Sequence, residues 1–168
     1  MDNGFDPAYS KMTRYDGGLG HAFARVLKFL LPDASCRVVP IMVNTYFPPA
    51  PSPQRCVQFG RALAAAIRRD PGIQRIVIIG SGGLSHTKID ERLDAEFLDF
   101  VKRNDLASMA AMPAALLVEG TSEILNWIAT AAAADHPGEV IEYQPLYRSK
   151  TGVGCAMGFA YWDLIDGR

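Results

Sequence analysis

A short run of aliphatic residues leads directly into a glycine-rich turn, and this junction constrains the fold more than any other stretch of the chain. Arg75–Ile79 reads RIVII, which predicts a buried strand. The chain continues as GSGGLSH over residues 80–86, where glycines permit a tight turn and a close approach of the backbone to a ligand. Ligand sites in α/β sheets gather at the carboxyl ends of strands, so His86 is a candidate for proton transfer. The alternative is a structural turn whose histidine caps the next helix.

A second apolar run, Arg37–Val43 (RVVPIMV), also predicts a buried strand. Pro40 cannot donate to a β-ladder, so it indicates an edge strand or a bulge. A proline-rich loop follows at Tyr46–Pro53. It is either a surface connector or one wall of a binding site at the end of the preceding strand.

The rest of the chain alternates between helical and strand patterns. Apolar spacing and stop signals predict helices over 54–69, 89–103, 105–111 and 121–134. Two further strands, 139–143 and 155–162, follow each other with no helix between them, which favours a mixed sheet. We therefore expect an α/β fold, a layered mixed sheet flanked by helices, in one domain that spans residues 1–168.

Composition excludes several classes of function. The 168 residues carry a formal net charge of −1 without a basic cluster, so neither nucleic acid nor an anionic membrane is an expected partner. The three cysteines show no CxxC spacing, which argues against a disulfide framework or a zinc knuckle and favours a reducing cytoplasm. We expect neither a signal peptide nor a membrane span.

Residue types alone leave the remaining candidate site residues undecided. Glu123 lies in the first turn of a predicted helix, where the helix dipole favours any acidic residue, and Glu119 and Glu142 are equally available carboxylates. His136 lies in an Asp-His-Pro-Gly turn and is expected at the surface. His21 lies where a helix is expected to begin.

Several segments together resemble the class III extradiol dioxygenases, the LigB-like family that includes protocatechuate 4,5-dioxygenase beta subunits. SGGLSH at 81–86 is the most diagnostic of them. The others, in chain order, are VPIMVN at 39–44, the helix with Arg55-Cys56 and Gly60, EILNW at 123–127, Tyr147-Arg148, and GCAMGFA at 154–160. The resemblance implies a LigB-like fold.

The resemblance also implies a chemistry. The histidine of SGGxSH is the family's active-site acid/base, here His86, and the glutamate of E-x-x-x-W is the carboxylate ligand of the iron, here Glu123. A facial triad of two histidines and a carboxylate leaves positions on Fe(II) for a catecholate and for O2. The implied reaction is the cleavage of a catechol- or protocatechuate-type ring, with the 46–53 and 147–154 loops shaping the substrate pocket.

Two departures from the family pattern open a second hypothesis. The family's histidine ligands precede the VPIMVN strand, and we expect this chain to lack that N-terminal segment and to cover about the last three-fifths of a family member. The motif Asp-His-Gly-Leu is Asp16-Gly17-Gly18-Leu19 here, although His21 could substitute in space. The chain is therefore either an enzyme that needs another chain or a further segment for its ligands, or a catalytically inactive binding protein. We expect a homo-oligomer or a partner subunit, because unpaired strand edges tend to pair with another chain.

Overall fold

The computed structural model describes residues 4–10, 19–33, 36–70, 72 and 75–164. The chain divides into two compact units, Met1–Val43 and Asn44–Arg168, and each is described by itself. The expectation of one domain over 1–168 stays a prediction.

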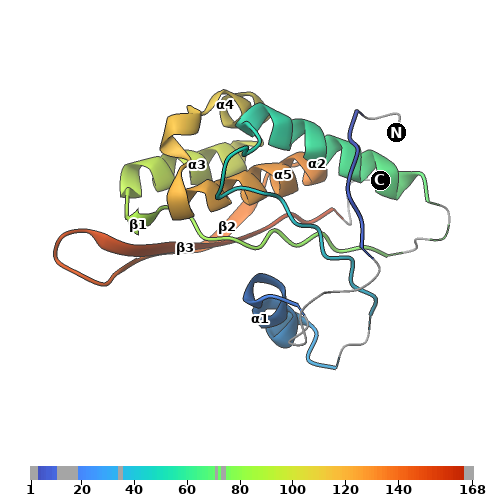
Figure 1. The fold of residues 1–168 in the computed structure, drawn as a ribbon, viewed down its shortest axis with the longest axis horizontal. Coiled ribbons are helices and arrows are strands. Elements are labelled where there is room, and N and C mark those ends of the chain that lie inside the picture. The colour runs from blue at the N-terminus through green and yellow to red at the C-terminus, as the bar shows by residue number, and fades with distance from the viewer. Residues whose placement is uncertain (1–3, 11–18, 34–35, 71, 73–74, 165–168) are drawn as a thin grey trace. The chain divides into compact units, whose positions relative to one another are not determined.

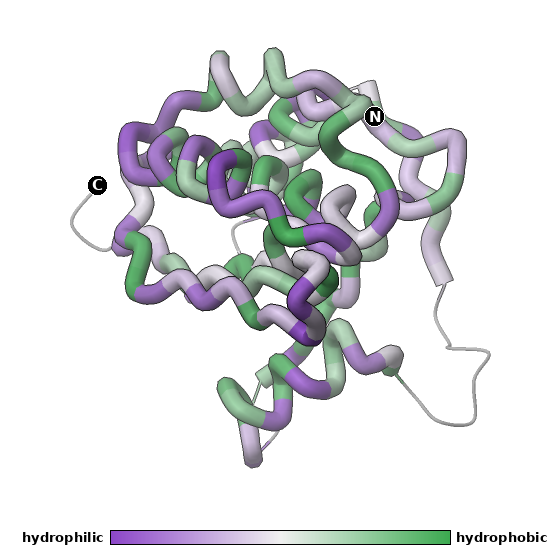
Figure 2. The backbone as a smooth tube through the Cα atoms, turned by 90° about the vertical axis from the view of Figure 1, so that its left-hand side faces the viewer, coloured by the Kyte–Doolittle hydropathy of each residue, from purple (hydrophilic) through white to green (hydrophobic). Residues whose placement is uncertain are grey.

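The first unit contains one described helix, α1 (His21–Leu30). His21 is its first residue, as expected, and Lys28 lies in its last turn, where a cation complements the helix dipole. In Figure 2 this helix, at the bottom, alternates between hydrophobic and hydrophilic residues along its length. The altered motif at Asp16–Gly18 lies outside the described residues.

The predicted strand at Arg37–Val43 is wrong. Its residues join no β-ladder with any described residue, and Val39 and Met42 are 81% and 85% exposed. A β-branched apolar run favours a strand, but its backbone groups form a ladder only where a neighbouring strand supplies partners.

The helices of the second unit follow the predicted spans closely. They are α2 (Pro53–Arg68), α3 (Glu91–Arg103), α4 (Leu106–Ala111) and α5 (Ile124–Ala134), with short 3-10 helices at Ala114–Leu116 (η1) and Glu119–Glu123 (η2). Side chains of Ser52, Asp90 and Asp105 accept hydrogen bonds from the free amides at the starts of α2, α3 and α4. Among the described residues, none of the helices combines the length and apolarity that crossing a bilayer requires.

Small residues let α2 and α5 pack closely. A Cβ atom on Gly60 would collide with the carbonyl oxygen of Ala129, and atoms of Ala132 and Ala133 would lie 2.8 and 2.9 Å from that Cβ. The alanine-rich sequence of α5 is therefore a helix-packing surface. An aromatic contact in the core joins Phe97 of α3 to Trp127 of α5, with ring centroids 6.1 Å apart in an edge-to-face arrangement.

The sheet consists of β1 (His86–Lys88), β2 (Glu139–Tyr147) and β3 (Val153–Tyr161), in the order β1-β3-β2. Figure 1 shows the long β2–β3 hairpin running below α3, α4 and α5 of the same unit. The α/β class is confirmed, but both ladders of the described sheet are antiparallel, whereas a mixed sheet was expected. On β3, Gly154 and Ala156 are buried, whereas Val153 and Phe159 are exposed.

The predicted strand at Arg75–Ile79 is also wrong. The segment is extended but unpaired with any described residue, and Ile76 and Val77 are 50% and 76% exposed. Backbone pairing begins further along, where the Leu84 amide donates to the Ala156 carbonyl and the Ala156 amide donates to the Ser85 carbonyl. His86 therefore opens a strand instead of following one.

Candidate active site

The candidate site is built around His86, whose position is fixed by the sheet. His86 is the Cα partner of Cys155 in the antiparallel β1–β3 ladder. Thr121 binds its backbone on the other side, because the His86 amide donates to Thr121 Oγ1 at 3.0 Å and this hydroxyl donates back to the His86 carbonyl at 3.3 Å. Strand β3 and the 3-10 helix η2 thus hold His86 between them.

One hydrogen bond settles which ring nitrogen of His86 carries the proton. Nδ1 lies 2.7 Å from the Leu84 carbonyl oxygen, and a carbonyl can only accept. Nδ1 is therefore the donor, and in the neutral imidazole the lone pair lies on Nε2. This nitrogen points toward Glu123 and Cys155.

Glu123 provides the carboxylate of the candidate site. Its Oε2 accepts a hydrogen bond from the Gly83 amide at 2.6 Å and lies 3.7 Å from His86 Nε2. The His86 and Glu123 side chains are 21% and 39% exposed, so both can be reached from solvent. The structure brings together the two residues that the sequence singled out; their roles stay predictions.

Two glycines, Gly83 of the turn and Gly120 of η2, make room for the His86 side chain. A Cβ atom on Gly83 would collide with Cε1 of the His86 ring, and one on Gly120 would collide with the His86 Cβ. Neither glycine has a positive φ angle. A tight turn and close approach to a ligand were expected for the glycines of residues 80–83, whereas Gly83 permits close approach of the protein's own His86 side chain.

The EILNW segment holds the glycine turn from the other side. Trp127 Nε1 donates to the Gly82 carbonyl at 3.0 Å, and Asn126 Nδ2 donates to the Ser81 carbonyl at 3.2 Å. Glu123 and Trp127 are one helical turn apart, so both reach the same turn. The two most distinctive sequence motifs of this unit are therefore partners in space.

A buried carboxylate anchors the segment just before His86. Asp94 is fully buried in α3, and it accepts hydrogen bonds from Ser85 N at 2.9 Å, Ser85 Oγ at 2.6 Å and Tyr143 OH at 2.8 Å. Ser85 Oγ in turn accepts from the Asp90 amide at 2.8 Å. Burial raises the pKa of the Asp94 carboxyl, and these hydrogen bonds oppose the rise. The pKa of the Tyr143 hydroxyl is also raised, by burial and then by Asp94.

Sequence reasoning missed both Asp94 and Tyr143. A signal for Asp94 was present, because it shares the apolar face of α3 with Phe97, Leu98 and Val101 at i+3, i+4 and i+7. A charged residue on such a face requires partners. Tyr143 had no comparable signal.

Cys155 was likewise absent from the predicted site. Its Sγ lies 3.0 Å from His86 Nε2. Burial, followed by the negative charge of Glu123, raises the pKa of the Cys155 thiol. Only the strand register identifies this contact, since 69 residues separate the two positions.

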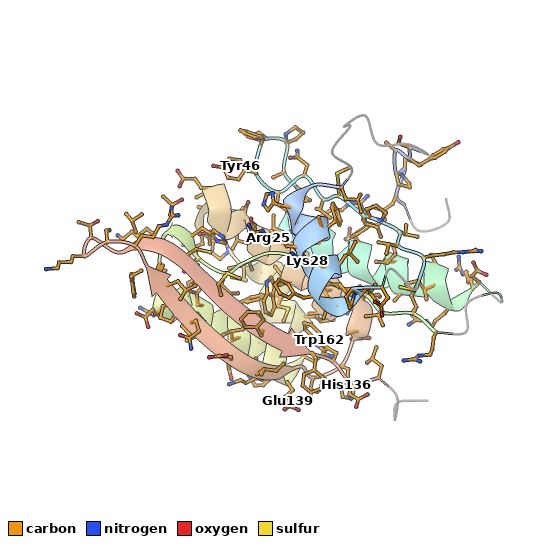
Figure 3. All side chains as sticks on the ribbon, turned by 90° about the horizontal axis from the view of Figure 1, so that it is seen from below. Arg25, Lys28, Tyr46, His136, Glu139 and Trp162 are labelled. Atoms are coloured by element: carbon orange, nitrogen blue, oxygen red, sulfur yellow. The ribbon has the colours of Figure 1, made fainter. Side chains whose placement is uncertain are left out.

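His136 and Glu142 lie away from the candidate site. His136 is exposed and precedes Glu139 at the start of β2, as Figure 3 shows. Glu139 pairs with Tyr161, six residues along β3 from Cys155, or about 20 Å at the usual strand rise. The prediction of a surface position for His136 is confirmed. Glu142 is exposed and hydrogen-bonds to Gln144, not to His86.

The loop at the tip of the hairpin lines an open hollow of about 730 Å³, formed by Tyr147, Arg148, Ser149, Lys150 and Gly152. Neither His86 nor Glu123 lines it. The proline-rich loop at 46–53 is mostly exposed, with Asn44 Nδ2 donating to the carbonyls of Phe47 and Pro49. That either loop shapes a substrate pocket stays a prediction.

The side chains present do not by themselves fit a complete metal centre. In the part of the chain that the structure describes, no group of three or more His, Cys, Asp or Glu residues could hold a metal ion. Glu123 supplies one carboxylate, and the His86 ring meets a thiol and a carboxylate in place of a second imidazole. A facial triad needs two histidines and a carboxylate on one face.

Comparisons with known proteins agree with the motifs. The profile of the catalytic LigB subunit of aromatic ring-opening dioxygenases matches residues 1–158. A gallate dioxygenase from Pseudomonas putida is 32% identical over 142 residues, which is 76% of this chain and 40% of that protein. A 2,3-dihydroxyphenylpropionate/2,3-dihydroxicinnamic acid 1,2-dioxygenase from Photorhabdus laumondii is 34% identical over 86 residues, 51% of this chain and 25% of the relative.

A second such dioxygenase, from Pseudomonas putida, is 35% identical over 101 residues, 55% of this chain and 30% of that protein. The chain thus spans at most 40% of the length of these relatives. The match over nearly the whole chain, together with the paired SGGLSH and EILNW motifs, establishes that this chain belongs to the LigB family.

Proposed function

We propose that this chain is part of an extradiol dioxygenase that opens a catechol- or protocatechuate-type ring with O2. The observation that carries the proposal is the position of the His86 ring, whose Nδ1 is bound to the Leu84 carbonyl and whose Nε2 lies 3.7 Å from the Glu123 carboxylate. An imidazole whose Nε2 is the acceptor nitrogen, held rigidly and within reach of solvent, is suited to take a proton from a phenolic hydroxyl. The relatives of this chain include enzymes named for gallate and for dihydroxyphenylpropionate, which supports an aromatic diol substrate.

Local backbone strain supports a functional role for this segment. Thr87, the residue after His86, has φ 64°, and Glu119, just before Gly120, has φ 50°. A left-handed conformation at a β-branched residue costs about 1–3 kcal/mol, and such strain concentrates at active sites. Both residues flank the contacts that hold the His86 ring.

We propose Fe(II) as the metal and Glu123 as one of its ligands. Bound iron would supply the redox chemistry that joins the aromatic ring to O2. Glu123 alone cannot complete a facial triad, so a partner subunit or homo-oligomer that supplies further ligands is part of this proposal. Cys36, Cys56 and Cys155 are all free thiols, which supports a reducing, cytoplasmic setting.

A second candidate function is a LigB-like binding protein without catalysis. The observation in its favour is the lack of a three-residue metal cluster among the described residues. The two functions differ in whether O2 is consumed.

The test is anaerobic loading with Fe(II), metal analysis, and O2 uptake with a panel of catechols. We expect uptake that is lost in His86→Gln and Glu123→Gln and kept in His136→Gln, a matched histidine far from the site. No uptake with any catechol, from protein assembled with its native partners, would favour the binding protein.

A further inference from the structure

The His86 ring is held at both of its nitrogens. Nδ1 donates to the Leu84 carbonyl at 2.7 Å, and Nε2 meets the Cys155 thiol at 3.0 Å. The second contact follows from the pairing of His86 with Cys155 in the β1–β3 ladder, which places both side chains on the same face of the sheet.

The direction of the thiol hydrogen bond follows from the first contact. In the neutral ring the proton lies on Nδ1, so Nε2 can only accept, and the Cys155 S–H is the donor of this contact. At 3.0 Å it is much shorter than the thiol's other contacts, 3.8 Å to the Ala156 carbonyl and 3.7 Å to Met157 Sδ. The thiol therefore occupies the lone pair that the proposed reaction would use.

We propose that Cys155 is a positioning residue that holds the His86 Nε2 lone pair in place until a phenolic hydroxyl of the substrate replaces the thiol. The proposal rests on the proposed function for the identity of the incoming hydroxyl. A thiol suits this task because S–H is a weak donor. It orients the ring, but a phenolic O–H, which donates more strongly, displaces it at little cost.

Alanine and serine at position 155 separate the donor from the side-chain volume. Cys155→Ala removes the donor, whereas Cys155→Ser keeps one in nearly the same space. Both variants are compared with the wild type for equal unfolding midpoints before any further measurement.

The first measurement is the rate at which diethylpyrocarbonate acylates His86, followed by peptide mass spectrometry. The reagent attacks a free imidazole lone pair, and the His86 side chain is 21% exposed. We expect Cys155→Ala to react about tenfold faster than the wild type, which is the effect of one hydrogen bond of about 1.4 kcal/mol. Cys155→Ser should react no faster than the wild type. His21 and His136, both exposed, are internal controls whose rates should not change.

Equal acylation rates in Cys155→Ala and Cys155→Ser, whether raised or not, would overturn the proposal, since the donor would then have no effect. This readout does not require ring cleavage.

The second measurement is O2 uptake by the Fe(II)-loaded protein. Positioning predicts a lower kcat in Cys155→Ala and a higher KM in Cys155→Ser, whose stronger donor competes with the substrate. Wild-type kinetics in both variants would also overturn the proposal. If the acylation rates differ as expected but neither the wild type nor either variant takes up O2, the proposed function is wrong. The contact of Cys155 with His86 would still be established.

Discussion

Removing the Asp94 carboxylate should destabilise the second unit by about 2–4 kcal/mol in Asp94→Ala. Three hydrogen bonds end on this carboxylate, and two of them come from Ser85, which is 1% exposed. A buried donor that loses its acceptor costs about 1–3 kcal/mol. The Tyr143 hydroxyl is only half-buried and can turn to water, and relief of the buried charge offsets part of the loss.

Asp94→Asn should cost about 1–2 kcal/mol, less than Asp94→Ala, because the Asn oxygen can still accept from the Ser85 amide. Its NH2 group can donate to Ser85 Oγ, but the Ser85 O–H then loses its acceptor. Asp99→Ala is the matched control on the same helix. Asp99 is exposed and pairs with Arg103 at 2.9 Å, and exposed ion pairs contribute little.

Urea unfolding followed by tryptophan fluorescence measures these differences, since Trp127 is buried in the core. With a slope of about 2 kcal/mol per molar urea, Asp94→Ala should unfold about 1–2 M earlier than the wild type. Equal losses in Asp94→Ala and Asp94→Asn, or a loss in Asp94→Ala no larger than in Asp99→Ala, would refute the hydrogen-bond argument.

The pH dependence provides an independent check on Asp94. Burial raises the pKa of its carboxyl in the folded protein above the unfolded value of about 3.9, so the folded state binds the proton more tightly. The stability that this proton contributes is fully present below the unfolded pKa and is lost as the pH rises through the folded pKa. The stability of the wild type relative to Asp94→Asn should therefore fall as the pH rises from about 4 toward neutrality. A relative stability that increases with pH would contradict the raised pKa.

Three further predictions concern the site and the assembly. Gly83→Ala should displace the His86 ring and lower the free energy of unfolding by about 1–3 kcal/mol through overpacking. The histidine ring signals in NMR spectra should change, and unchanged signals would contradict the close approach of Gly83 to the ring. The isolated chain should retain Fe(II) weakly after desalting, because its described residues offer no three-ligand cluster, and stoichiometric retained iron would reveal a further ligand, with His21 the first to test. The chain should self-associate in light scattering across a dilution series, because exposed apolar segments such as Arg37–Val43 and Arg75–Ile79 favour pairing with another chain, and a monomer at every concentration would exclude this.

Local sequence patterns determined most of the helical structure. The periodicity that predicted a helix over 54–69 corresponds to α2, and the one over 89–103 corresponds to α3 after a two-residue correction at its start. That correction has a local cause, because Asp90 caps the helix by accepting from the Leu93 amide. Helices depend mainly on contacts within four residues, so a local pattern carries enough information to predict them.

The strands divide according to whether their partners are close in sequence. The two strands predicted at 139–143 and 155–162 correspond to β2 and β3, which are neighbours in the chain and pair with each other, although their antiparallel pairing was not predicted. Arg37–Val43 and Arg75–Ile79 had stronger strand patterns, yet neither forms a ladder with any described residue. A strand pattern indicates only that a segment prefers an extended backbone. Whether the segment joins a sheet depends on a hydrogen-bonding partner, which the tertiary structure provides.

For the candidate site too, some residues could be predicted from the sequence and others only from the tertiary structure. The sequence by itself selected His86 and Glu123, because SGGLSH and EILNW resemble motifs of one family, but it said nothing about what surrounds them. Only the folded chain placed Cys155 against the His86 ring and turned Asp94 toward Ser85. These contacts depend on the register of β1 against β3 and on the packing of α3 against the sheet. Register and packing are set by many residues acting together over the whole unit, which is why no local segment encodes them.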